Sequence, residues 1–302
     1  MKAAPFAYVR PGTLDEAVAE LRRDGAKVLA GGQSLVPVLA MRLGRPSTLV
    51  DINAVEELNR LACQDGLLRV GATVRQRHLL RDDRSAQVPL LRLALPWVGH
   101  REIRSRGTVC GSLAHADPSA ELPAVAVCLE ATMVVAGPRG PREVPAAEFF
   151  TGAMSTAVHA DELLAEVRFP VARLGEGYGF AEFARRHGDF ALAGVAVKVV
   201  SQGDDVTAVA TCFGVSDRPV RVDMSDQLHQ ALQESDGTPT EQELREALTP
   251  ACAELADRVV DTGGDSHASP AYRRQLIAAL ATRELSRAYL KSISTTVGSH
   301  RP

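Results

Sequence analysis

Apolar and polar positions in the first 55 residues follow patterns that predict a small mixed α/β unit. Thr13 and Glu16 form a capping box, directly before apolar residues that recur at helical spacing from Leu14. Short apolar runs bounded by polar residues or glycine indicate strands. The expected elements are a helix over 14–23, strands over 26–29 and 48–52, and a helical or turn-rich stretch over 35–43.

The middle of the chain continues this mixture. Pro96 ends a long helical pattern, because proline cannot continue the hydrogen bonding of a helix. The glycines and prolines of 137–141 predict a turn between two strands. The expected elements are strands over 67–71 and 131–135, helical material from 78 to 95, and a helix over 120–129.

The last third predicts a second domain with an antiparallel sheet. A glycine-containing stretch over 170–179 is the candidate inter-domain linker, and 202–205 is a hairpin signal between two apolar runs. The chain as a whole is therefore expected to be α+β. The expected elements are strands over 191–200 and 206–215 and helices over 242–248 and 271–289.

Two glycine-centred loops of related composition carry the candidate chemistry. One is Ala30-Gly31-Gly32-Gln33-Ser34-Leu35 and the other is Thr108-Val109-Cys110-Gly111-Ser112-Leu113. We expect each to follow a strand or its approach, 27–29 and 103–109. Glycine lets main-chain N–H groups approach phosphate oxygens, and a hydroxyl adds a donor. A lone Gly-Gly is usually an ordinary turn, but two such loops suggest a long ligand held at two points, such as a dinucleotide.

Composition limits the function classes. The chain has 302 residues, 45% of them hydrophobic, which is enough for two packed domains. A net charge of −3 with dispersed basic residues makes nucleic-acid binding unlikely. The N-terminus lacks the apolar core of a signal peptide, and no apolar stretch approaches the roughly 20 residues of a membrane span. We expect a cytoplasmic protein.

The cysteines argue against clusters and disulfides in this chain. Their number, five, is odd and no C-x-x-C spacing occurs. An iron–sulfur cluster needs about four thiolates brought together. Any cluster in an electron path is therefore expected in another chain, and no metal site is expected here. The cysteines are Cys63, Cys110, Cys128, Cys212 and Cys252.

The string from Arg106 to Pro123, together with the first loop, resembles the FAD-binding subunit of the molybdenum hydroxylases. This family includes the medium subunit of carbon monoxide dehydrogenase and related aldehyde, nicotine and xanthine dehydrogenases. Residues 71–73, 162–170 and 183–191 fit further family segments, so the likeness covers nearly the full chain. It implies a two-part FAD-binding domain of the vanillyl-alcohol-oxidase (PCMH) type and a smaller α+β domain of the carbon monoxide dehydrogenase flavoprotein type. The implied boundaries are 1–172 with subdomains of about 1–55 and 56–172, then 176–292, and a tail over 293–302.

The resemblance also implies which residues hold FAD. The first loop would wrap the pyrophosphate and ribityl region, and the second would hold the other side of the diphosphate. Ile103 would form a wall of the adenine pocket, and Leu164 would pack near the adenine or flavin. The implied cofactor-binding residues are Ala30, Gly31, Gly32, Gln33, Ser34, Leu35, Ile103, Gly107, Thr108, Cys110, Gly111, Ser112, Ala114, His115, Asp117, Glu121, Leu164 and Glu182.

Two residues depart from the family pattern. Cys110 stands where relatives usually have the first glycine of a Gly-Gly pair, so a thiol is expected within contact distance of the cofactor. It would either be rotated into a small gap or touch the flavin, even bonding to it. Glu182 precedes Arg185-Arg186 where relatives often carry lysine ahead of the arginine pair. The usual tuning of the reduced flavin by a cation is therefore in doubt.

The resemblance implies an electron-transfer role without catalytic acid–base residues, because the flavin supplies the redox chemistry. A molybdopterin-binding large subunit would oxidise the substrate, and a [2Fe-2S] small subunit would relay electrons. FAD in this chain would pass them to a quinone, NAD or oxygen. The alternative is a stand-alone FAD-dependent oxidoreductase that acts directly on a small molecule, conceivably in secondary metabolism. A structural or flavin-storage subunit is a third reading.

Overall fold

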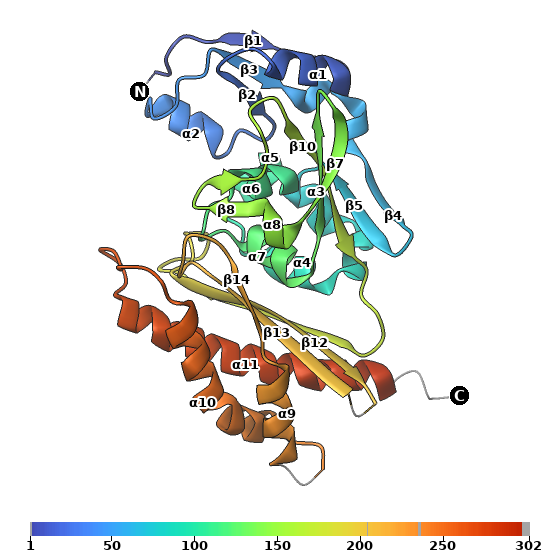
Figure 1. Ribbon diagram of the computed structural model, residues 1–302, viewed down its shortest axis with the longest axis vertical. Helices are drawn as coiled ribbons and strands as arrows, with labels where there is room; N and C mark the ends of the chain where they lie inside the picture. The colour runs from blue at the N-terminus through green and yellow to red at the C-terminus, as the bar shows by residue number, and fades with distance from the viewer. Residues whose placement is uncertain (1, 204, 235–236, 298–302) are drawn as a thin grey trace. The chain divides into compact units, whose positions relative to one another are not determined.

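The computed structural model describes residues 2–203, 205–234 and 237–297 (Figure 1). Its contacts divide the chain into two compact units, and the chain passes between them several times. We call them the N-terminal unit and the C-terminal unit, and each is described by itself. The N-terminal unit consists of residues 1–87, 99–117 and 130–171, and the C-terminal unit of residues 88–98, 118–129 and 172–302.

The N-terminal unit opens with a parallel three-stranded sheet. β1 (Ala7–Val9) and β2 (Ala26–Leu29) lie on either side of β3 (Thr48–Asp51). α1 (Leu14–Leu21) connects the first two strands, and both hydrogen bonds of its capping box are present. α2 (Leu35–Ala40) follows β2. The predicted helix and strands of this region are confirmed, and β1 is an additional strand.

The second layer of the N-terminal unit is an antiparallel sheet with the order β4-β5-β10-β6-β7. Short helices connect its strands, and α6 packs against β5 and β10. Single 3-10 turns cover Ile52–Ala54, Glu56–Asn59 and Asp83–Gln87. The strands are β4 (Leu61–Gln64), β5 (Leu67–Gly71), β6 (Thr132–Gly137), β7 (Gly140–Pro145) and β10 (Leu163–Pro170), with a small pair β8 (Phe150–Gly152) and β9 (Ser155–Thr156); the helices are α3 (Gln76–Arg81), α5 (Arg101–Arg106), α6 (Val109–His115) and α8 (Ala146–Phe149).

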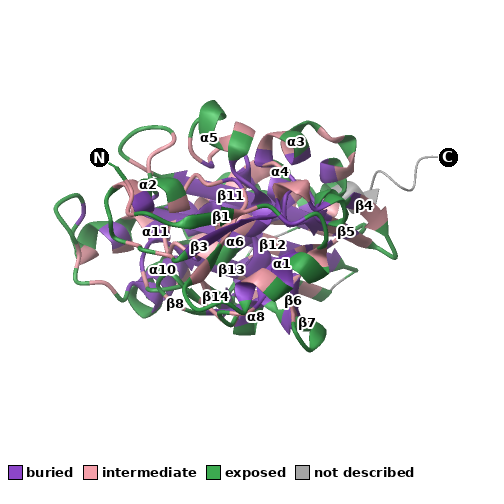
Figure 2. Ribbon diagram, turned by 90° about the horizontal axis from the view of Figure 1, so that it is seen from above, coloured by how far each residue is buried: buried purple, intermediate pink, exposed green. Residues whose placement is uncertain are grey.

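The C-terminal unit contains the predicted antiparallel sheet, in the order β11-β12-β13-β14. α11 packs against β11 and β12, and the apolar residues between them form one core (Figures 1 and 2). α4 packs against β11, and α7 against β12 and β13. The elements are α4 (Pro89–Ala94), α7 (Glu121–Cys128), β11 (Glu176–Phe183), β12 (Ala193–Gln202), β13 (Asp205–Phe213), β14 (Val220–Asp223), α9 (Ser225–Gln233), α10 (Glu241–Val259) and α11 (Pro270–Val297).

The helical material predicted over 78–95 is confirmed as three pieces: α3, a 3-10 turn, and α4, which starts anew at Pro89. Proline fits the first turn of a helix but not its interior. Residues 103–109 do not approach the second glycine loop as a strand. They belong to two short helices, α5 and α6, separated by Gly107 and Thr108.

The C-terminal elements are longer than predicted. β11 begins at Glu176, inside the stretch expected to be a linker. Its glycines serve packing, since a Cβ on Gly177 would overlap the main-chain carbonyl of Ala288 in α11. α10 runs on through Pro250, and α11 reaches Val297. The tail expected from 293 is therefore helical to that residue, and 298–302 lie outside the described residues.

Candidate functional site

The first glycine segment, 30–35, borders a hollow of about 430 Å³ in the N-terminal unit. Gly32 adopts a φ of +75°, which places the chain in the left-handed region that favours glycine. Ser34 precedes α2 and makes no side-chain capping hydrogen bond. The residues that line the hollow are Leu29, Ala30, Gly31, Gly32, Gln33, Val36, Pro37, Asp51, Asn53 and Arg106.

Main-chain donors are available at this hollow. Among the described residues, none accepts a hydrogen bond from the N–H groups of Gly32, Gln33 or Ser34. Such N–H groups ahead of a helix attract anions, because they are unsatisfied and point the same way. The segment can therefore bind phosphate oxygens, as the sequence predicts.

The second glycine segment forms the first turn of α6. Thr108 is the N-cap, and its Oγ1 accepts a hydrogen bond from the N–H of Gly111 at 3.0 Å. A Cβ on Gly111 would lie 2.6 Å from that oxygen. Glycine is thus required here by the cap itself, in addition to any ligand.

The two glycine segments lie against each other in the N-terminal unit. A Cβ on Gly31 would overlap the carbonyl oxygen of Arg106 and lie 2.9 Å from Cα of Gly107. Gly107 is equally confined, since its Cβ would lie 2.8 Å from Oε1 of Gln76. The structure therefore joins the first segment with the start of the second, which supports the sequence hypothesis of one ligand held at two points.

Asn53 and Arg75 connect the segments, and sequence reasoning missed both. Asn53 donates from Nδ2 to the carbonyl of Ala30 at 2.9 Å. Arg75 donates from Nη2 to Oδ1 of Asn53 at 2.6 Å and from Nη1 to the carbonyl of Arg106 at 2.5 Å. A usable signal was their position, because Asn53 lies two residues after the end of a buried strand and Arg75 lies two residues after the family-like segment 71–73.

Charge at this site is mixed. Burial and the nearby Arg106 lower the pKa of the Arg75 guanidinium. Burial alone would raise the pKa of Asp51, but hydrogen bonds from Tyr8 and Asn53 lower it below its usual value. The site thus combines the guanidinium groups of Arg75 and Arg106 with free main-chain N–H donors. Its one carboxylate, that of Asp51, already accepts hydrogen bonds from Tyr8 and Asn53. This donor set fits a diphosphate.

Cys110 does not present its thiol to solvent. The residue is 2% exposed, and Sγ lies 3.4 Å from the carbonyl oxygen of Val70 in β5. Burial is the main cause that raises the pKa of this thiol well above its usual range. Of the two readings of this thiol, the geometry favours the one in which it is rotated into a small gap of the core. Contact of Cys110 with the cofactor stays a prediction.

The remaining predicted residues are more scattered. Ile103 in α5 is 37% exposed, whereas Leu164 in β10 is 5% exposed. Glu121 and Glu182 belong to the C-terminal unit, whereas the other predicted residues belong to the N-terminal unit. Four predicted residues lie in α6 or just beyond its C-terminal end. Ala114 is exposed, and Ser112, His115 and Asp117 are half-buried.

Glu182 is a buried carboxyl in β11. Neither of its carboxyl oxygens has a hydrogen-bond partner among the described residues, and Glu182 as a whole is 7% exposed. Burial, with the charge of Glu121 at the start of α7, raises the pKa of Glu182 to about 8. The group is therefore largely protonated at neutral pH.

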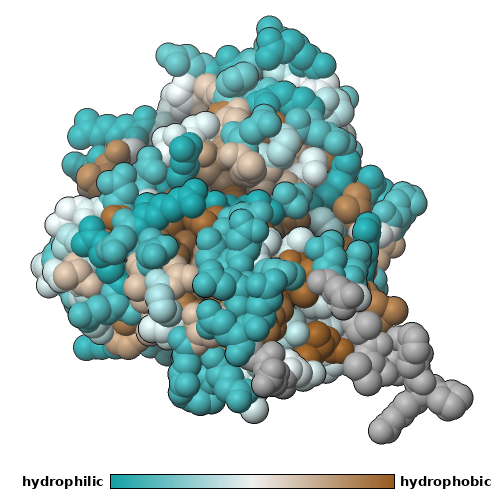
Figure 3. Space-filling view, turned by 60° about the horizontal axis from the view of Figure 1, so that its bottom comes forward, coloured by the Kyte–Doolittle hydropathy of each residue, from teal (hydrophilic) through white to brown (hydrophobic). Residues whose placement is uncertain are grey.

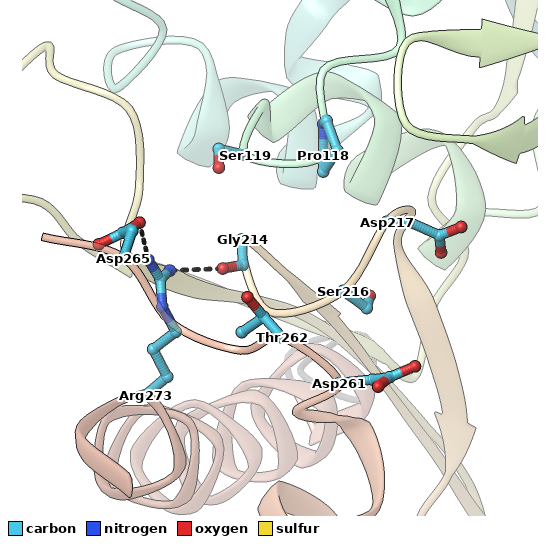
Figure 4. A pocket seen from close by; sticks show the side chains of 9 residues that line it. All are labelled: Pro118, Ser119, Gly214, Ser216, Asp217, Asp261, Thr262, Asp265 and Arg273. Atoms are coloured by element: carbon cyan, nitrogen blue, oxygen red, sulfur yellow. Dashed lines mark hydrogen bonds and ion pairs between the residues drawn. The ribbon is translucent and has the colours of Figure 1, made fainter. Parts of the chain in front are cut away.

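A second hollow, of about 350 Å³, lies within the C-terminal unit (Figure 4). Arg273 at its edge is 5% exposed and donates to the carbonyl of Gly214 at 2.7 Å and to Asp265 at 2.6 Å. Its charge is thus used to join α11 to the loop after β13. The other residues that line this hollow are Pro118, Ser119, Ser216, Asp217, Asp261 and Thr262.

The face in Figure 3 is mostly hydrophilic, with apolar side chains in separate small areas. Isolated apolar side chains are normal on protein surfaces and mark no site by themselves. Within the described residues, no group of three or more His, Cys, Asp or Glu side chains is placed to hold a metal ion. No helix in that same part of the chain is long and apolar enough to cross a membrane.

Comparison with known proteins gives matches over nearly the whole chain. Residues 4–172 match the model for the FAD binding domain in molybdopterin dehydrogenase, and residues 178–288 match that for the CO dehydrogenase flavoprotein C-terminal domain. The chain is 37% identical to caffeine dehydrogenase subunit beta of Pseudomonas sp. (strain CBB1), over 95% of this chain and 96% of the relative.

Two solved structures have the same fold. Quinoline 2-oxidoreductase from Pseudomonas putida 86 superposes with a TM-score of 0.85 at 35% identity, over 98% of this chain and 99% of that chain. Reconstituted CO dehydrogenase from Oligotropha carboxidovorans also gives a TM-score of 0.85, at 30% identity, over 96% and 99% of the two chains. The mixed α/β architecture with antiparallel sheets and a smaller second domain is thus confirmed.

Proposed function

Because this chain belongs to the family of FAD-binding subunits of molybdenum hydroxylases, we propose that it carries electrons from an iron–sulfur partner to an external acceptor. FAD is the cofactor of this family, and when bound it supplies the redox chemistry. The protein itself binds and orients the cofactor.

One observation supports this assignment above the others: Gly31 of the first glycine segment lies against Arg106 and Gly107, directly before the second segment, with free main-chain donors beside the contact. Gly32, Gln33 and Ser34 would hold phosphate oxygens through their N–H groups. Arg106 lines the same hollow, and its guanidinium would offset the charge of a diphosphate. Because FAD would carry the electrons, the protein needs no acid–base group of its own at these two segments.

The partners follow from the same family membership. We propose that a large molybdopterin-binding subunit and a small [2Fe-2S] subunit assemble with this chain, because the relatives are named as subunits. None of the five cysteines, all within the described residues, forms a disulfide, and four of them are buried, so we place the clusters in another chain. Quinones, NAD and oxygen are the classes of acceptor that we propose.

The test is purification of the protein from its native host with a tag on this chain. We expect FAD in the extract and two companion subunits, one rich in molybdenum and one in iron and sulfide. FMN alone, or no flavin after reconstitution with FAD, would contradict the assignment. Isolation as a flavoprotein without companions, but with direct oxidation of a small molecule, would favour the stand-alone enzyme.

A further inference from the structure

Asn53 and Arg75 bridge the two glycine segments through one continuous set of hydrogen bonds. The bridge starts at the carbonyl of Ala30 in the first segment, passes through the Asn53 amide and the Arg75 guanidinium, and ends at the carbonyl of Arg106, one residue before Gly107. One end is a main-chain atom of the first segment, and the other lies two residues before Thr108, where the second segment begins.

The orientation of the Asn53 amide is determined by its neighbours. Nδ2 faces two acceptors, the carbonyl of Ala30 and Oδ1 of Asp51, whereas Oδ1 faces the guanidinium of Arg75. Asp51 also accepts from the main-chain N–H of Asn53 at 2.9 Å, which holds the side chain in place. An aspartate at position 53 would have no donor for Ala30 and would face the carboxylate of Asp51.

Arg75 uses two separate nitrogens for its two contacts. A guanidinium presents donors in a planar fork, so it can reach Asn53 and the Arg106 carbonyl at once, whereas a lysine ammonium is a single point. The carbonyl that Arg75 holds is the one that lies against Gly31. The guanidinium therefore also determines where the two segments meet.

We propose that Asn53 and Arg75 are positioning residues that set the spacing of the two glycine segments for FAD. The proposal rests on the function proposed above and deepens it. Neither residue has to touch the cofactor. Loss of either should let the segments move apart, which lowers FAD affinity because preorganised donors are lost, while each sheet remains folded.

The experiment measures the Kd of FAD for apo-protein of four variants: Asn53→Asp, Arg75→Lys, and the matched controls Asn59→Asp and Arg77→Lys. The binding temperature is chosen well below the melting temperature of each variant, and circular dichroism checks that each is folded. We expect the Kd to rise tenfold or more for the two bridge variants and less than twofold for the controls. A double variant should lose little more than either single one, because the bridge acts as a unit.

A merely structural role would lower the melting temperature of the apo-protein without a change in Kd at the lower temperature, and this result would overturn the proposal. Additive losses in the double variant would overturn the idea of a bridge. If Asn53→Asp does not fold, Asn53→Ser removes the bridge without an added charge and is read the same way. Failure of the wild-type protein to bind FAD would instead overturn the proposed function.

Discussion

Gly31 lies directly against the main-chain carbonyl of Arg106, with no space for a Cβ between them. We expect Gly31→Ala to push the two glycine segments apart and to weaken FAD binding tenfold or more. The contact is with backbone, so no side-chain rotation can relieve it. Flavin fluorescence on titration of apo-protein measures the affinity.

The matched control is Gly263→Ala, where a Cβ would meet no atom within 4 Å. It should leave FAD affinity unchanged. Unchanged affinity in both variants would show that the approach of Gly31 to Arg106 is not needed for binding.

Flavin should be released from the wild-type protein by acid or denaturing detergent, because the thiol of Cys110 is buried against Val70 and its pKa is raised. In the native protein a thiol reagent such as dithionitrobenzoate should modify the half-buried Cys63 before Cys110. Mass spectrometry of the labelled peptides gives the order. Flavin that remains on wild type but not on Cys110→Gly after denaturation would contradict this account.

Thr108→Val should destabilise the N-terminal unit by about 1 kcal/mol, because it removes the hydroxyl that caps α6. Thr108→Ser keeps the oxygen that accepts from Gly111 and should cost less. Urea unfolding measures both. A larger loss in Thr108→Ser than in Thr108→Val would mean that the buried methyl group, and not the cap, matters at this position.

Glu182 should make stability depend on pH. Its folded pKa of about 8 lies above the unfolded value of 4.5, so the folded state holds a proton that the unfolded state has lost between these values. The contribution is thus fully present below pH 4.5 and is lost as the pH rises toward 8. Relative to Glu182→Gln, the wild type should lose about 2 to 4 kcal/mol of unfolding free energy between pH 5 and pH 8.

The measurement is urea unfolding of both proteins across this range. Glu254→Gln, at an exposed position of α10, serves as the control and should follow the wild type. Parallel curves for wild type and Glu182→Gln would show that Glu182 is charged throughout and finds a partner.

Local signals predicted much of the fold. The Thr13–Glu16 capping box, the strand before Gly31 and the hairpin between β12 and β13 depend on neighbours in sequence, and all three are confirmed. The sequence predicted helical material over 78–95 as a whole, because the residues on both sides of Pro89 favour helix individually. The full length of α10 was missed because packing tolerates Pro250 inside it.

The site was predictable only where it is contiguous. Glycine and hydroxyl residues mark the two segments in the sequence. The contact of Gly31 with Arg106 depends instead on how parts of the chain that are distant in sequence pack together. Asn53 and Arg75 carry no local signature, since asparagine and arginine are common in loops. Cys110 stands where the family resemblance leads us to expect glycine. Only the structure shows that its side chain turns into the core.

The C-terminal unit contains two segments from the first half of the chain, 88–98 and 118–129. The ribosome makes both of them well before the rest of that unit. All eight residues of α7 are buried in the finished protein, yet the strands it packs against, β12 and β13, leave the ribosome much later. At a synthesis rate of about 5–20 residues per second, β12 and β13 are made several seconds after this apolar helix. During translation it is a natural binding site for chaperones, and a gene fragment that ends at residue 172 would leave it permanently exposed.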